Sequence, residues 1–122
     1  MTRERLALGR SGEARAARVL QGLGWKILER GWRTRFGELD IVACDGETLV
    51  FVEVKTRAAA GAFAPESSVG RSKQGRLIRS ALSYLESKGI QDRPLRFDVL
   101  VFDGPDCCRH IRGAFEAEGY SL

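Results

Sequence analysis

The segment GELDIVACDGETLVFVEVK, residues 37–55, carries the clearest structural signal in the chain. It is typical of two β-strands joined by a tight turn, because Asp45 and Gly46 favour the positive backbone dihedrals of a two-residue hairpin loop. That loop makes Asp40 and Glu53 diagonal neighbours across the two strands, about 7–8 Å apart at the backbone. Carboxylates at this separation can reach one ion, so the hairpin predicts a paired acidic site.

Alternation of side chains along a strand divides this hairpin into two faces. Asp40 is expected to pair with Phe51, which puts it on the face that carries Leu49, Glu53 and Lys55. The opposite face is expected to be apolar throughout: Leu39, Ile41, Ala43, Val50, Val52 and Val54. A bulge between Asp40 and Glu53 would move one carboxylate to the other face, so the interpretation depends on the register.

Length and composition indicate a single domain over residues 1–122. Hydrophobic content of 43% supplies one ordinary core. No apolar run approaches membrane-spanning length, and the first residues lack the apolar stretch of a signal peptide. A cytoplasmic protein is therefore expected.

Three cysteines and one histidine exclude several classes of site. Cys44, Cys107 and Cys108 are odd in number, and two of them are adjacent, which does not suit a disulfide framework. With His110 as the single histidine, a zinc site or a histidine-based hydrolase is not expected. We interpret the cysteines as reduced thiols.

Basic residues lie on both sides of the acidic hairpin, and the net charge is +4. Those before it are Arg3, Arg5, Arg10, Arg15, Arg18, Lys26, Arg30, Arg33 and Arg35. Those after it are Lys55, Arg57, Arg71, Lys73, Arg76 and Arg79. A polyanion-binding surface and an ordinary solvated surface account for this pattern equally well.

Residues 6–23 are predicted to form a helix that ends at Gly24. Glu13 heads an apolar row made by Ala16, Ala17, Leu20 and Leu23. Two interpretations of Glu13 remain open. It is either a carboxylate favoured by the helix dipole, or a carboxylate directed along the core face into a site.

The segments around the hairpin complete the sheet. Residues 25–30 are predicted to form a strand that continues irregularly to residue 36, with both tryptophans in packing roles. Residues 95–102 are predicted to form a strand parallel to the second hairpin strand, with a helix between them. A short strand is expected near residues 109–111, and residues 113–122 are expected to form a loose tail.

A second helix is predicted over residues 72–87, with Ser72 as its N-cap and Gly89 as its stop. Lys73 lies in its first turn, where the helix dipole disfavours a cation, so Lys73 is expected to face an anion or solvent. Residues 58–71 before this helix are predicted to form a mobile loop. That loop is interpreted either as a flap over a substrate or as a connector.

The pattern Asp40-(x12)-Glu53-x-Lys55 suits metal-dependent phosphoryl chemistry. Hard carboxylate oxygens hold magnesium, and the Val54 carbonyl is an additional candidate ligand. Lys55 would orient an attacking water or neutralise charge that develops on a phosphate. A lone Glu-x-Lys is usually an ordinary surface pair, but here Glu53 lies inside a strongly apolar strand, which favours a purpose for the charges.

Several motifs resemble the YraN family of bacterial proteins, and the resemblance covers nearly the whole chain. They are SGEA at 11–14, WRTRFGELDIV at 32–42, LVFVEVKTR at 49–57, VGRSK at 69–73, ALSYL at 81–85 and RFDV at 96–99. That family is similar to the PD-(D/E)xK nuclease superfamily, and within it to archaeal Holliday-junction resolvases. Leu39-Asp40 stands here at the position of the proline-aspartate pair.

The resemblance implies an α/β restriction-endonuclease-like core with a mixed sheet flanked by helices, in the order α-β-β-β-α-β. It implies that Asp40 and Glu53 bind metal, that Lys55 is the catalytic lysine, and that Glu13 is the acidic residue of the first helix. A homodimer is a further expectation from the resemblance.

The sequence therefore predicts a Mg²⁺-dependent nuclease, with Mn²⁺ as a substitute, that acts on DNA rather than RNA and includes branched DNA among its candidate substrates. Phosphates would contact Arg10, Arg15, Arg35, Arg57, Lys73 and Arg76. A non-catalytic nucleic-acid-binding module on the same scaffold is the alternative, and a purely structural interaction protein is a third.

Overall fold

The computed structural model describes residues 3–57, 70–105 and 107–117; the side chains of residues 3–11 and of Arg57 lie outside that description. The elements are α1 (Arg3–Gly22), β1 (Lys26–Thr34), β2 (Gly37–Asp45), β3 (Thr48–Arg57), α2 (Arg71–Lys88), β4 (Leu95–Asp103) and β5 (Cys108–Phe115). The strands form one sheet in chain order, in which β3 and β4 are parallel and the other pairs are antiparallel. This confirms the predicted α/β class and element order, which is consistent with a nuclease-like core.

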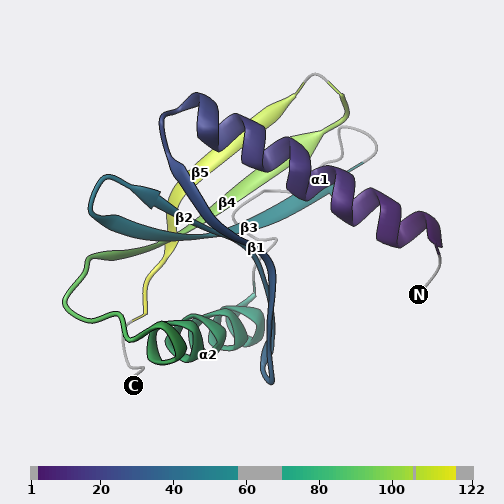
Figure 1. Cartoon of the computed structure of the whole chain (residues 1–122). Helices are drawn as coiled ribbons and strands as arrows, with labels where there is room; N and C mark the ends of the chain where they lie inside the picture. The colour runs from purple at the N-terminus through teal and green to yellow at the C-terminus, as the bar shows by residue number, and fades with distance from the viewer. Residues whose placement is uncertain (1–2, 58–69, 106, 118–122) are drawn as a thin grey trace.

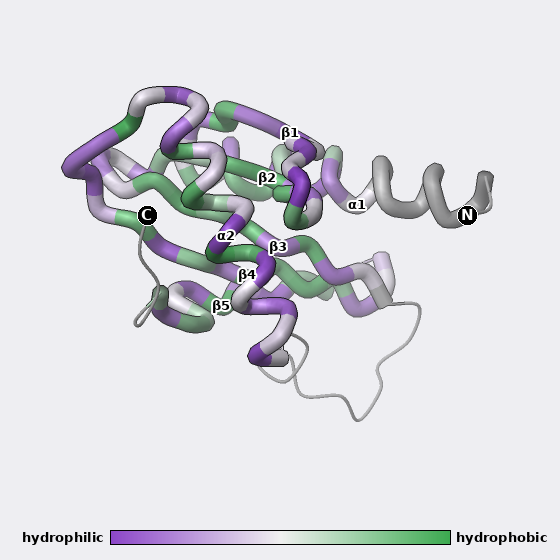
Figure 2. Tube along the Cα trace, turned by 90° about the horizontal axis from the view of Figure 1, so that it is seen from below, coloured by the Kyte–Doolittle hydropathy of each residue, from purple (hydrophilic) through white to green (hydrophobic). Residues whose placement is uncertain are grey.

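One helix covers each face of the sheet, so the molecule has three layers (Figure 1). The α1 side is packed by Ala16, Ala17, Leu20, Trp25, Ile41, Ala43, Val50, Val52, Leu100 and Phe102. The α2 side is packed by Leu77, Ile78, Ala81, Tyr84 and Leu85 against Val42, Leu49, Phe51, Phe97 and Val99. Figure 2 shows hydrophobic stretches along the central strands between the two helices. Burial of these two apolar faces is the main favourable term in folding.

The hairpin turn lies one residue further along than predicted. Asp45 pairs with Thr48, so the loop is Gly46-Glu47, and Gly46 has φ 59°. The predicted pairing of Asp40 with Phe51 is therefore wrong by two positions: Val42 pairs with Phe51. A shift of two positions leaves every side chain of a strand on the same face of the sheet. Asp40, Phe51 and Glu53 therefore still share one face, as predicted.

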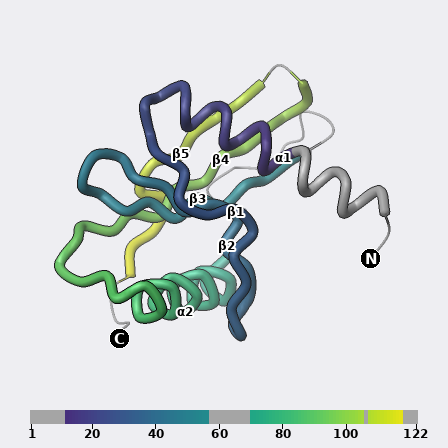
Figure 3. The backbone as a smooth tube through the Cα atoms, viewed as in Figure 1, coloured from purple at the N-terminus to yellow at the C-terminus, as the bar shows by residue number. Residues whose placement is uncertain are grey.

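The strands β2 and β3 separate just before the acidic residues. Their register ends at the pair Ile41–Val52, whereas β2 continues to pair with β1 as far as Thr34–Gly37. Figures 1 and 3 show the resulting β1–β2 arm extending away from the sheet beside α2. The hydroxyl groups of Thr34 and Ser80, 2.9 Å apart, join this arm to α2. The separation opens one end of the sheet.

Three smaller expectations were wrong. The N-cap of α2 is Gly70 rather than Ser72, although its C-cap is Gly89 in a left-handed conformation, as predicted. Leu23 is 48% exposed and does not continue the apolar row of α1. Leu39 packs on the α2 side, apart from Ile41, in the part of β2 that pairs with β1 and no longer with β3.

Strand β5 also differs from the expectation. It extends from Cys108 to Phe115 and includes residues 113–115 of the predicted tail, because Phe115 pairs with Phe97 and stacks on its ring. The predicted loop falls mostly on residues 58–69 and the end of the tail on residues 118–122, both outside the described residues. In the part of the chain that the structure describes, no helix is long and apolar enough to cross a membrane.

A buried carboxylate ties β4 to β5. Asp98 is 1% exposed and accepts hydrogen bonds from Arg96 at 2.9 and 3.1 Å and from the Gly113 backbone N–H at 3.0 Å. The Nε2 atom of His110 lies 2.8 Å from Oδ2 of Asp98. Burial alone would raise the pKa of Asp98, but the hydrogen bonds from His110, Arg96 and Gly113 outweigh it and hold the pKa below the ordinary 3.8.

Replacement of this carboxylate, Asp98→Asn, is expected to lower the free energy of unfolding by about 3 kcal/mol at neutral pH, because Arg96 loses a buried charged partner. The folded-state pKa lies below the unfolded one. The stabilisation is therefore present above pH 4 and is lost as the pH falls through the folded-state pKa. Urea unfolding at pH 7 and pH 3 measures both values, and a difference that stays equal at the two pH values would contradict the assignment.

Candidate active site

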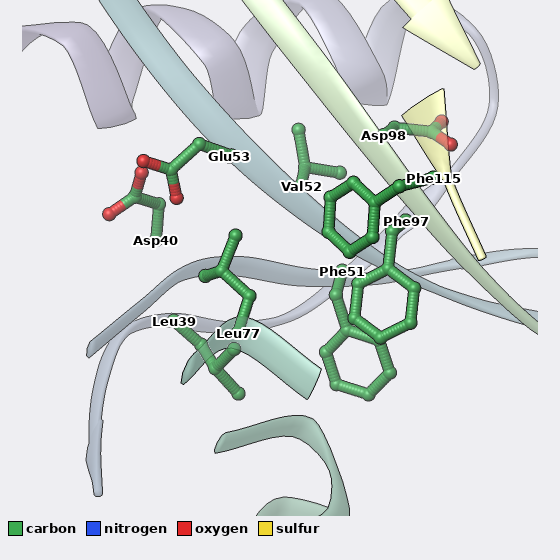
Figure 4. Close-up of a pocket in the computed structure, with 9 residues that line it drawn as sticks. All are labelled: Leu39, Asp40, Phe51, Val52, Glu53, Leu77, Phe97, Asp98 and Phe115. Atoms are coloured by element: carbon green, nitrogen blue, oxygen red, sulfur yellow. The ribbon is translucent and has the colours of Figure 1, made fainter. Parts of the chain in front are cut away.

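Asp40 occupies the gap where β2 leaves β3. Its Oδ2 accepts a hydrogen bond of 2.9 Å from the backbone N–H of Val54, in place of a β2 carbonyl. Extension of the β2–β3 register by one step puts Asp40 opposite Glu53, closer than the predicted diagonal. Figure 4 shows the two carboxylates facing each other, with Asp98 turned away from them. The structure thus brings the two predicted metal ligands together.

Glu53 is the buried member of the pair, with 8% of its surface exposed. Two ammonium groups contact the same oxygen, Oε1: Lys73 at 2.6 Å and Lys55 at 3.7 Å. Lys55 lies two residues along β3, so strand alternation places it on the face of Glu53, as the sequence predicts. Lys73 reaches the same oxygen from the first turn of α2.

The charges in this cluster change one another's protonation. Burial and the negative charge of Glu53, with a further contribution from Glu13, raise the pKa of Asp40 to about 8, so protonated Asp40 shares a hydrogen bond with Glu53. Burial and the adjacent Lys73 lower the pKa of Lys55. Burial acts against the charge of Lys73 as well, but its hydrogen bond with Glu53 raises the pKa of Lys73 above the usual range. Lys73 is therefore the firmly charged partner of Glu53.

Two further carboxylates, those of Glu13 and Glu38, lie near Asp40. One carboxylate oxygen from each of Glu13, Glu38 and Asp40 lies within 4.8 Å of the others, a spacing that suits a shared metal ion. This geometry favours the second interpretation of Glu13, a carboxylate directed into a site.

Two glycines make this approach feasible. A Cβ atom at Gly12 would lie 2.7 Å from Thr56 Oγ1, so the absence of a side chain lets α1 pack closely on β3 next to Glu13. Gly31 has φ 60°, and a Cβ atom there would meet the carboxylates of Glu38 and Glu13 at 3.4 and 3.6 Å. A side chain at position 12 would push α1 away from Thr56, and one at position 31 would have to adopt an unfavourable positive φ beside the two glutamates.

Below the acidic pair, a small pocket extends towards α2 between Leu39, Phe51, Leu77 and Phe97. Its interior of about 10 Å³ holds roughly one water molecule. Apart from Asp40, Glu53 and Asp98, the residues that line the pocket are apolar.

The predicted phosphate-binding residues differ in their contacts and exposure. Arg15 does not face solvent freely: it donates to the carbonyls of Gly104 and Pro105 at 3.0 and 2.5 Å and lies over the Phe102 ring. This is a structural role in holding α1 on the β4–β5 turn. Lys73 binds Glu53, as described above. Arg35 and Arg76 are exposed, on the β1–β2 arm and on α2. Two further predicted residues have side chains outside the described part of the chain: Arg10 and Arg57.

Glu38 was not predicted from the sequence. Lys73 was predicted to contact phosphate and to face either an anion or solvent. Glu38 lies two residues before Asp40 on the same strand, so the alternation of side chains could have predicted that both point to the same face of the sheet. For Lys73 the signal was its position in a helix first turn that contains no acidic residue, which indicated an anion beyond the helix. That anion is Glu53.

Comparison with known proteins assigns the chain to a family. The profile of the uncharacterised protein family UPF0102 matches residues 12–102, which include every residue of the acidic cluster. The chain belongs to this family. The assignment confirms the resemblance to the YraN proteins.

Relatives in the UPF0102 family share much of the sequence. A UPF0102 protein of Geobacter sulfurreducens is 48% identical over 113 residues, which cover 89% of this chain and 88% of the relative. One of Geotalea daltonii is 45% identical over 113 residues, covering 89% of each. One of Rhodococcus jostii is 44% identical over 114 residues, covering 90% of this chain and 97% of the relative. The family carries no functional description, so function is argued from the site.

Removal of the Asp40 charge is expected to stabilise the protein in the absence of divalent ions. The pKa of about 8 is above the unfolded-state value of 3.8, so stability is lost as the pH rises between these values. Asp40→Asn avoids this loss and still accepts the Val54 hydrogen bond. We expect ~2 kcal/mol of stabilisation at pH 8, vanishing near pH 4, in urea unfolding with EDTA.

The matched control is Glu47→Gln, an exposed carboxylate in the turn of the same hairpin, which should change stability little at either pH. An Asp40→Asn protein that is less stable than the wild type at pH 8 would show that the lysines already hold Asp40 ionised.

Proposed function

We propose that this UPF0102 protein is a magnesium-dependent nuclease that hydrolyses phosphodiester bonds in DNA. The observation that carries the proposal is the convergence of Asp40, Glu53 and Lys55 at the point where β2 and β3 separate. These are the residue types that metal-dependent phosphodiester hydrolysis requires, and they come from neighbouring strands at one opening of the fold.

The donor set fits a divalent ion. Glu13, Glu38 and Asp40 offer hard carboxylate oxygens within 4.8 Å of one another, and Glu53 adds a carboxylate next to Asp40. These are the ligands that magnesium prefers. Burial, together with the negative charges of Glu53 and Glu13, is why the pKa of Asp40 is raised to about 8 in the ion-free protein. Asp40 and Glu53 would hold the ion, and the Val54 carbonyl is the additional candidate on the backbone.

When bound, such an ion supplies a Lewis acid and lowers the pKa of a coordinated water. The chain's own residues supply the rest. Lys55 lies beside Glu53 and is placed to orient a nucleophilic water or to neutralise charge on the phosphate. The Val54 N–H fixes the Asp40 carboxylate, which preorganises the site before substrate arrives.

DNA, with branched forms among the candidate substrates, is the proposed partner, and contacts to phosphates are expected to dominate its affinity. Of the predicted phosphate contacts, Arg35 on the β1–β2 arm and Arg76 on α2 are exposed, and both are proposed for this role. A homodimer would supply paired sites for two strands; this expectation comes from the resemblance to resolvases.

A non-catalytic nucleic-acid-binding module is the second candidate function, and one observation favours it. In the ion-free protein, Glu53 is neutralised by Lys73 and Lys55, and Asp40 is protonated up to about pH 8. The charge of Glu53 is therefore compensated without a metal. Such a module would bind nucleic acid independently of divalent ions and would cleave none.

Cleavage of linear, single-stranded, flapped and four-way-junction DNA with Mg²⁺ or Mn²⁺ tests the main proposal. The wild type is expected to cut at least one form, and Asp40→Ala or Glu53→Ala should reduce the rate by a factor of at least about 10³, because the ion loses a principal ligand. Circular dichroism of both variants checks that the fold is intact.

Two results would decide against the proposal. Cleavage that survives both substitutions would remove this mechanism, and binding without cleavage of any form would favour the non-catalytic module. Glu47→Gln serves as the matched control, because it removes a carboxylate of the same hairpin far along the strands from the opening.

Arg35→Ala and Arg76→Ala are each expected to weaken binding to all DNA sequences similarly and to reduce the slope of log affinity against log salt by about 1. Arg18→Ala, which removes an exposed arginine from α1, is the matched control and should change neither quantity. Fluorescence anisotropy at several salt concentrations measures both. Equal effects of all three substitutions would mean that the arm and α2 form no particular interface.

A further inference from the structure

Lys73 is an active-site cation that the sequence pattern of two carboxylates and one lysine does not include. Its Nζ lies 2.6 Å from Glu53 Oε1, whereas Lys55, the lysine of that pattern, lies 3.7 Å from the same oxygen. Both ammonium groups therefore share one carboxylate oxygen, and Lys73 is the nearer of the two. It is therefore in contact with the centre of the proposed metal site rather than at its rim.

The position of Lys73 in α2 is costly unless an anion faces it. It lies in the first turn, where the helix dipole is positive, and this turn contains no acidic residue. The N-cap, Gly70, offers no side chain to accept from the turn. The α2 N-terminus and the Lys73 ammonium together direct positive charge at buried Glu53, so the ion pair is built from two elements.

We infer that Lys73 is a resident counter-cation of the proposed metal site, which occupies Glu53 in the ion-free protein and competes with the divalent ion for that carboxylate. The inference rests on the proposed function. Lys55 is less suited to this role, because its Nζ lies farther from Glu53 Oε1 and because it is carried by the same strand as Glu53.

Charge and coordination chemistry both predict competition. An ammonium group has no lone pair, so it cannot share the coordination sphere of a metal and can only hold or release the carboxylate oxygen. With an ion in place, Lys73 would be repelled by the ion, by Lys55 and by the positive end of α2 at once. The ammonium must therefore weaken the affinity for the ion, and its release leaves a positive charge beside the opening to which a phosphate comes.

A purely positioning role for Lys73 predicts the opposite. If the lysine only holds the Glu53 side chain in place for the ion, its loss should weaken ion binding. Lys73→Gln separates the two roles, because glutamine retains a hydrogen-bond donor but no charge. Lys73→Met removes the donor as well, and Lys73→Arg retains the charge.

Calorimetric titration of the full chain with Mn²⁺ alone, without nucleic acid, tests the inference. Lys73→Gln and Lys73→Met are expected to bind Mn²⁺ about tenfold more tightly than the wild type, the order of magnitude for one like charge removed at close range. Lys73→Arg is expected to stay within about twofold of the wild type. The matched control is Arg79→Met, which removes an exposed positive charge from α2 and should also stay within about twofold.

Each outcome has one meaning. If the wild type binds Mn²⁺ and the neutral variants bind it equally or less tightly, the counter-cation role is wrong while the proposed function stands. If Arg79→Met tightens binding as much as Lys73→Gln, net charge and not Lys73 is the cause, and the inference fails. If the wild type binds no Mn²⁺ and cleaves no DNA, the metal site itself is wrong, and both proposals fall together.

Discussion

The hydrogen bond from the Val54 N–H to the Asp40 carboxylate is the contact on which the candidate site depends. At this point β3 exchanges a backbone partner on β2 for a side chain, so β2 can leave β3 and continue with β1 as a separate arm. A buried N–H without a partner would be costly, so the strands can separate here because a carboxylate takes the vacant place. Asp40 thus lies where the β2–β3 pairing ends, and its side chain is also part of the candidate site.

The pKa values of two aspartates, Asp98 and Asp40, are shifted in opposite directions. Asp98 is surrounded by donors, Arg96, His110 and the Gly113 N–H, and its pKa is held below the ordinary value. Asp40 shares its place with Glu53 and Glu13, receives one backbone donor, and its pKa is raised to about 8. A satisfied carboxylate stabilises a fold, whereas crowded carboxylates are the arrangement expected where a cation is bound. This contrast separates the structural acid from the candidate ligands.

The basic residues divide in the same manner. Arg15 holds α1 on the β4–β5 turn, and Lys73 neutralises Glu53, so neither is a free phosphate contact in the described structure. Arg35, on the β1–β2 arm, and Arg76, on α2, are exposed. Net charge therefore overstates the surface available to a polyanion, because some of that charge stabilises the fold or the site.

The sequence by itself determined the α/β class, the order of the elements and the shared face of Asp40, Glu53 and Lys55, because strand alternation and helical periodicity are local properties. An error of two residues in the turn left the faces unchanged for the same reason. Only the tertiary structure decided that Lys73 contacts Glu53, that Glu13 and Glu38 meet beside Asp40, and that Arg15 is structural. Those contacts join residues on different elements, and they depend on how closely helix and sheet pack, which periodicity along one segment does not specify.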